Sequence, residues 1–167
     1  MDHCNEVYLI FFKCYKQEGY LVEAQNQKNI VSMEQNVNSL QRFAEQGLEK
    51  LKDLKGCNND ASLVVACRNA LYFYKAEAKK GPLMTDYFLK EEAFIKTKKQ
   101  FDSKPSSKRT KQEIDQFNAA VNDINDALKT FNTANKDLNK ERGDMLDDWN
   151  KTYSRYMDTY MPKQQRQ

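Results

Sequence analysis

The sequence predicts an all-α protein: an antiparallel up-down-up-down four-helix bundle whose two longer helices extend beyond the body as a helical hairpin. The first observation is the alternate spacing of three and four between apolar residues from 111 to 160, which indicates one helical stripe roughly 75 Å long. The second is the scarcity of helix breakers, since the 167 residues include only 5 glycines and 3 prolines. A helix this long cannot bury its stripe on itself, so the rest of the chain must supply partners.

Two shorter segments before residue 55 show the same apolar spacing. The first predicted helix covers residues 2–26, where Gly19 is expected to weaken or kink it. The second covers residues 29–54 and ends in lysines, which suit the negative end of the helix dipole. Gly56 then ends this helix, as is typical of a residue just past a helix C-terminus.

A third helix is expected to begin after Asp60, a favourable N-cap residue, and to continue to Phe101. Gly81-Pro82 interrupts its pattern, and the proline is expected to break or kink the helix. Residues 103–107 are the clearest loop in the chain. The fourth helix follows.

The unequal helix lengths predict where the body ends. We expect the two longer helices to continue alone as a hairpin of residues 83–101 against residues 111–131, beginning near Asn135 at the level of Pro82. The alternative is that Pro82 folds the second half of the third helix back onto the body. In either case Asn135 and Arg142 occupy seam positions, where buried polar residues set the register of packed helices.

Composition and motifs limit the possible functions. The length suits a single domain, residues 1–162, followed by a frayed tail at 163–167. A net charge of +3 does not indicate nucleic-acid binding. His3 is the only histidine, and the sequence contains neither a Cys-x-x-Cys motif nor a glycine-rich phosphate loop. We therefore expect no enzyme activity, no catalytic residue, no metal site and no cofactor.

Four cysteines are spaced in two equal intervals. Within one helix, ten residues separate Cα atoms by about 15 Å, which is too far for a disulfide. The equal intervals instead suggest Cys4 facing Cys57 and Cys14 facing Cys67 on two parallel helices. Two disulfides here would indicate folding in an oxidising compartment. The other interpretation is four buried free thiols.

A basic patch lies between residues 96 and 112, opposed there only by Asp102. In the predicted fold this charge lies at the tip of the hairpin, where it can dock on an anionic surface or form an ordinary solvated loop. Phe101 is the only aromatic residue among these charges, so no specific nucleic-acid site is expected. The basic residues are Lys96, Lys98, Lys99, Lys104, Lys108, Arg109 and Lys111.

Aromatic residues gather at the opposite end of the predicted bundle. Tyrosine rings pack well and carry a hydroxyl that needs a partner, so such a cluster either lines a small-ligand pocket or forms plain core. The residues of this candidate pocket are Tyr72, Trp149, Tyr153 and Tyr156.

The segment from Leu48 to Lys75 resembles a family of all-helical exported or surface proteins of unknown function from Bacteroidetes and spirochaetes. The resemblance rests on the sequence LEKLKDLKG, on Asp60 and Ser62-Leu63, and on Phe73-Tyr74-Lys75. It implies an exported bundle with no known catalytic residues, for which lipid anchoring is an option. This sequence departs from the family in its four cysteines, and it shows no lipobox.

The resulting interpretation is a non-enzymatic helical-bundle protein of the bacterial cell envelope or exterior, with a structural or interaction role. It would act as a monomer or weak dimer and bind a protein partner or an anionic surface. No apolar run approaches the ~18 residues needed to span a membrane. The alternatives are a cytosolic adaptor or scaffold that dimerises through its exposed seam, and a carrier of a small apolar ligand in the bundle core.

Overall fold

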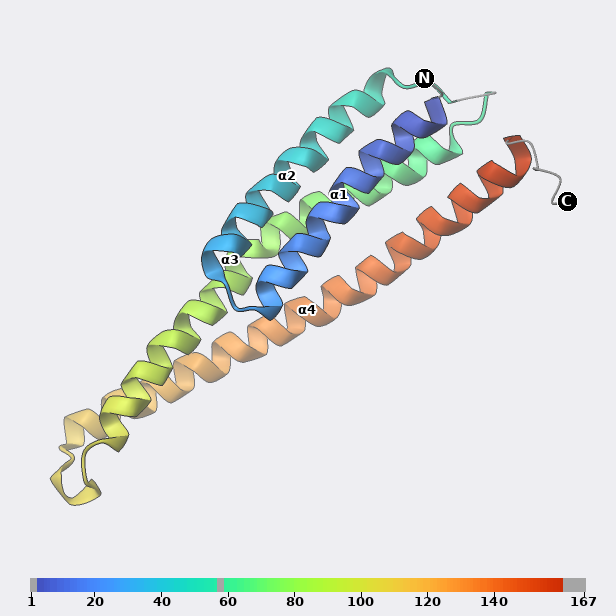
Figure 1. Ribbon diagram of the computed structural model, residues 1–167. Coiled ribbons are helices and arrows are strands. Elements are labelled where there is room, and N and C mark those ends of the chain that lie inside the picture. Colours follow the sequence, from blue (N-terminus) through green and yellow to red (C-terminus); the bar gives the residue numbers. More distant parts are fainter. Residues whose placement is uncertain (1–2, 57–58, 161–167) are drawn as a thin grey trace, which may run out of the picture.

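A computed structural model describes residues 3–56 and 59–160 and confirms the all-α prediction (Figure 1). The helices run antiparallel to their chain neighbours, and the described residues contain no strand. None of these helices is apolar enough to cross a membrane. The predicted tail at 163–167 lies outside the described residues. The elements are α1 (His3–Asn26), α2 (Ile30–Asp53), α3 (Ser62–Asp102), the 3₁₀ turn η1 (Ser106–Lys108) and α4 (Lys111–Tyr160).

Helix α3 is the centre of the assembly, because it packs on each of the other three helices. Helix α1 packs on both α2 and α3, whereas α4 packs its backbone closely on α3 alone. Helix α4 reaches α1 through long side chains, among them Trp149, which stacks on Phe11 at 3.9 Å between ring centroids. The largest fully buried side chains come from all four helices and include Leu40, Tyr74 and Leu138.

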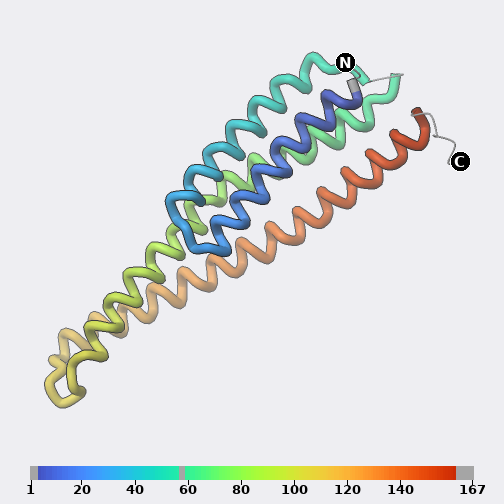
Figure 2. The backbone as a smooth tube through the Cα atoms, in the orientation of Figure 1, coloured from blue at the N-terminus to red at the C-terminus, as the bar shows by residue number. Residues whose placement is uncertain are grey.

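Helix α3 continues through Gly81-Pro82, so α3 and α4 extend past the other two helices as a hairpin (Figure 2). The expected break at Pro82 and the alternative of a folded-back second half are therefore wrong. Pro82 is exposed, and the Thr85 hydroxyl donates to its carbonyl at 3.0 Å. Gly81 is buried, and its missing side chain lets α2 approach through Val37.

Glycine-to-alanine substitutions should have opposite effects on stability at glycines that contact a neighbouring helix and at glycines that contact nothing. Alanine at Gly19 or Gly143, where a Cβ atom meets nothing within 4 Å, is expected to raise the free energy of unfolding by about 0.5–1 kcal/mol. Gly81→Ala should lower it by about 1–3 kcal/mol, because the new Cβ would lie 2.6 Å from Val37 Cγ2. Urea denaturation measures all three, and a stabilising Gly81→Ala would contradict the close approach of α2 and α3.

The register between α1 and α3 differs from the expected one. The Cys67 thiol lies 3.6 Å from the Val7 carbonyl, and Lys28 pairs with Glu91 at 2.7 Å. Residues of α1 therefore lie beside α3 residues numbered about 60 higher, and the body covers α3 as far as Glu91 rather than Pro82. On α4, Asn135 accepts from Gln25 near the end of α1, close to the predicted dividing point.

Two helix starts rest on side-chain caps. Asn29 accepts from the Ser32 amide at 3.0 Å and begins α2, in line with the predicted start at that residue. At the start of α4, Thr110 and Glu113 form a reciprocal capping box: Thr110 Oγ1 accepts from the Glu113 amide and Glu113 accepts from the Thr110 amide. The Thr-x-x-Glu spacing in the sequence is the signal for this cap.

Candidate functional site

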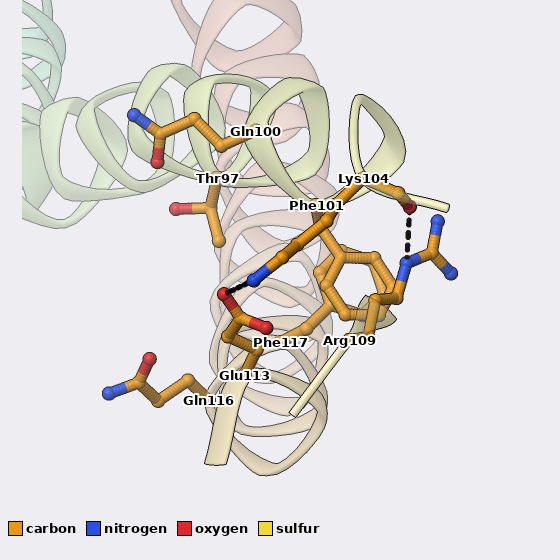
Figure 3. A pocket seen from close by; sticks show the side chains of 8 residues that line it. All are labelled: Thr97, Gln100, Phe101, Lys104, Arg109, Glu113, Gln116 and Phe117. Carbon is orange, nitrogen blue, oxygen red and sulfur yellow. Dashed lines mark hydrogen bonds and ion pairs between the residues drawn. The ribbon is translucent and has the colours of Figure 1, made fainter. Parts of the chain in front are cut away.

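The tip of the hairpin holds a shallow pocket of about 220 Å³ between the end of α3 and the start of α4 (Figure 3). Its floor is aromatic, because Phe101 and Phe117 stack with ring centroids 4.1 Å apart and interplanar angle 5°. Two chain segments on either side of η1 bring these rings together. The pocket is lined by Thr97, Gln100, Phe101, Lys104, Arg109, Glu113, Gln116 and Phe117.

Charged groups at this pocket are already partnered within the tip. Lys104 pairs with Glu113 at 2.6 Å, and this hydrogen bond lowers the pKa of the Glu113 carboxyl to about 2. Arg109 lies over the Phe101 ring at 4.1 Å and donates from Nε to the Lys104 carbonyl at 2.9 Å (Figure 3). These contacts fold the loop back on the hairpin end, so Lys104 and Arg109 are structural at least in part.

The structure divides the predicted basic patch into engaged and available charges. Besides Lys104 and Arg109, Lys98 is engaged, since it pairs with Asp102 at 2.5 Å one turn away. The remaining four lysines are exposed and have no ion-pair partner in the described part of the chain. They are Lys96, Lys99, Lys108 and Lys111.

The apolar seam of the hairpin is incompletely buried. Beyond Phe88 on α3 and before Ala127 on α4, no residue of the described hairpin is fully buried. Phe94 and Phe117 stack at 6.0 Å but remain half-exposed, and Ile95 is 59% exposed. A pair of helices can cover only one side of each stripe, so the seam of the hairpin stays partly open. The body also exposes single apolar side chains such as Val31 and Leu9, but these lie around a closed core.

A cluster of buried charges joins three helices inside the body. Arg142 of α4 contacts Glu18 of α1 through Nε, and its Nη2 donates to Glu77 of α3 at 2.5 Å. Glu18 is 4% exposed and Glu77 3% exposed, which is rare for carboxylates. Arg142 thus holds α4 to both α1 and α3, which confirms it as a polar residue of the seam.

The buried cluster has more negative than positive groups. One guanidinium faces two carboxyls, and the second oxygen of Glu77 has no hydrogen-bond partner in the described structure. Burial, reinforced by the Glu18 charge, raises the pKa of Glu77 to about 8 although Arg142 opposes this shift. Burial also raises the pKa of the neighbouring Tyr74 hydroxyl. The geometry therefore favours a protonated Glu77 at neutral pH.

Sequence reasoning identified Arg142 but missed its two carboxylate partners. The helical spacing in the sequence is consistent with burial of both glutamates. Glu77 falls three residues after Tyr74 and Glu18 four residues after Cys14, and both Tyr74 and Cys14 are buried. Each glutamate therefore lies on the buried stripe of its helix rather than on the outer face. Only the shared arginine identifies them as a pair, and the three residues are far apart in the sequence.

The predicted aromatic pocket is filled by its own rings. Trp149 stacks on Phe11, and Tyr153 packs on Tyr8 with ring centroids 5.5 Å apart. The cavity that Tyr156 lines measures about 10 Å³, too small for a ligand. Tyr72 does not join the group at all, because its side chain is 56% exposed on α3. The cluster is core, and the inclusion of Tyr72 was wrong.

The predicted Cys14–Cys67 disulfide is absent, and both residues are buried free thiols. The Cys67 thiol lies 3.6 Å from the Val7 carbonyl, and Cys14 is near enough to contribute to the raised pKa of Cys67 without being bonded to it. Burial raises the pKa of both thiols to about 12, so neither is a reactive thiolate at neutral pH. Cys4 is buried too, whereas its predicted partner Cys57 lies outside the described residues.

Comparisons of this chain with protein-family models, with curated proteins and with solved structures find no match.

Proposed function

We propose that this chain is a non-enzymatic interaction protein that uses the part of its hairpin beyond Glu91, residues 92–126, as its binding surface. One observation supports the proposal above the others: the apolar seam of the hairpin remains incompletely buried, whereas the body closes a complete core. Apolar residues on a protruding pair of helices are typical of surfaces that another helix completes.

The charges of the hairpin support a specific contact rather than nonspecific association. Lys96, Lys99, Lys108 and Lys111 are available at the tip and favour an acidic partner surface. An anionic lipid surface is supported less well, because the loop at 103–110 carries no large apolar side chain to enter a bilayer.

The proposed location of the protein is the bacterial cell envelope or exterior. The resemblance of residues 48–75 to exported bundle proteins of Bacteroidetes and spirochaetes supports the bacterial cell envelope or exterior. The alternative remains a cytosolic adaptor or scaffold that uses the same seam. Both settings require the same hairpin surface, so one experiment tests the interaction role in either.

A photo-crosslinking amino acid tests the hairpin as a binding surface. The label is placed at Ile95 in the hairpin and, as matched control, at Tyr72 in the body; both lie on α3 with nearly equal exposure, 59% and 56%. In cells that make the protein, we expect discrete crosslinked species from position 95 and none from position 72. Equal crosslinking from both positions, or none from position 95, would contradict an interaction role for the hairpin.

A further inference from the structure

One face of α3 passes from covered to uncovered where the body ends. Phe88 is buried beside the α1–α2 turn, whose Lys28 pairs with Glu91 at 2.7 Å. Ile95 follows Phe88 by seven residues, or two helical turns, and therefore continues the same face. It is nevertheless 59% exposed, since no helix of the body reaches it. An apolar side chain thus stands where the covering helices stop.

Opposite charges flank Ile95 on this face. Glu92 lies three residues before it and Lys99 four residues after it, so each is one turn away on the same side of α3. Both side chains are exposed, and neither has an ion-pair partner within the described structure. Along α3 the face therefore reads acidic, apolar, basic.

The whole hairpin repeats this polarity on a larger scale. Its inner half, residues 83–95 and 119–131, carries five acidic residues against two basic ones. Its outer half, residues 96–118, carries seven basic residues against three acidic ones. The hairpin is therefore negative toward the body and positive toward its tip.

We propose that this face binds a second copy of the chain in antiparallel orientation, with Ile95 of each copy at a two-fold axis and Glu92 of each facing Lys99 of the other. The inference rests on the proposed function of the hairpin and names its partner. When a second copy is turned end for end, its basic residue faces the acidic residue of the first copy and its acidic residue faces the basic one. An isologous contact requires such self-complementarity. A parallel pair would oppose like charges. Since the α1–α2 turn occupies this side at Glu91, the two α3 helices cross at an angle near Ile95.

A foreign acidic helix fits this face less well than a second copy does. It would pair with Lys99 but would oppose Glu92, which lies two turns away on the same face. The second copy pairs both charges twice, once on each side of the axis. This symmetry gives a direct test: exchanging the charges at positions 92 and 99 in one chain should restore the dimerisation that either single substitution weakens.

Sedimentation equilibrium of the purified full chain tests the dimer. The wild-type mass should move from one chain toward two as concentration rises, and added salt should weaken this association. Glu92→Lys and Lys99→Glu should each weaken dimerisation by about tenfold or more, because each creates two like-charge contacts across the axis. The doubly exchanged chain, Glu92→Lys with Lys99→Glu, should recover the wild-type constant, and so should an equimolar mixture of the two single variants.

A wild-type chain that stays at the mass of one chain over the whole concentration range would overturn the proposal. So would single variants that dimerise like the wild type, or an exchanged chain that stays as weak as they are. All substituted side chains are exposed, and an unchanged helix content verifies folding. Crosslinking from position 95 in cells, with no dimer of the purified chain, would leave the interaction role intact and refute only the second copy as partner.

Discussion

Replacing Arg142 by methionine should lower the free energy of unfolding by about 3–5 kcal/mol, the largest effect expected of one substitution outside the apolar core. The guanidinium is the group that contacts both Glu18 and Glu77, which are almost fully buried. Its removal leaves two carboxyls without a cationic partner in an interior that solvates charge poorly. Urea denaturation at neutral pH measures the loss.

Two further variants separate the loss of charge pairing from the loss of packing. The triple variant Glu18→Gln, Glu77→Gln, Arg142→Met removes the arginine and both carboxyls together and should recover most of the lost stability. Arg155→Met changes an exposed arginine on the same helix and should stay within about 0.5 kcal/mol of the wild type. A stable Arg142→Met variant would show that the cluster does not hold α4 to the body.

Stability should fall as pH rises from 4.5 to 8, through the ionisation of Glu77. Its pKa rises from a usual value of 4.5 to about 8 in the folded chain, chiefly because of burial. Folding therefore takes up a proton between these pH values, since the unfolded chain is already ionised there. The favourable contribution is complete below pH 4.5 and is lost by pH 8, with a slope of up to about 1.4 kcal/mol per pH unit.

Glu77→Gln isolates this contribution, because glutamine resembles the protonated acid and does not ionise. The variant and the wild type should have similar stability near pH 4.5, and the variant should become the more stable of the two as pH approaches 8. Glu34→Gln, a change at an exposed glutamate of α2, should follow the wild-type curve. Parallel curves for Glu77→Gln and the wild type would contradict a protonated Glu77 in the folded state.

Local patterns were sufficient to predict the helices and their lengths. The stripe from Ile114 to Tyr160 gave α4 with bounds that match the structure, because apolar periodicity and the flanking turn residues act within a few residues. The same lengths implied the hairpin. The expected break at Pro82 did not occur, because one missing hydrogen bond on an exposed face does not outweigh the packing of the turns on either side.

The sequence predicted some parts of the candidate sites and not others, because some depend on local sequence and others on the tertiary fold. The basic patch could be read as a run of charges, and the tip of the hairpin follows from helix length. Which of its lysines are engaged depended on the fold of the loop, since the Lys104–Glu113 pair forms only when α4 turns back on α3. The aromatic cluster was placed at the correct end but with Tyr72 included, because position along a helix does not fix which way a side chain faces.

By itself, the sequence determined the four helices, their order and the helical hairpin that the rest of the chain leaves uncovered. Only the tertiary structure decided the register, in which α1 residues lie beside α3 residues numbered about 60 higher. Register depends on how side chains from several helices interlock at once, and equal cysteine spacing carries no information about it. The same register brings Glu18, Glu77 and Arg142 together from three helices.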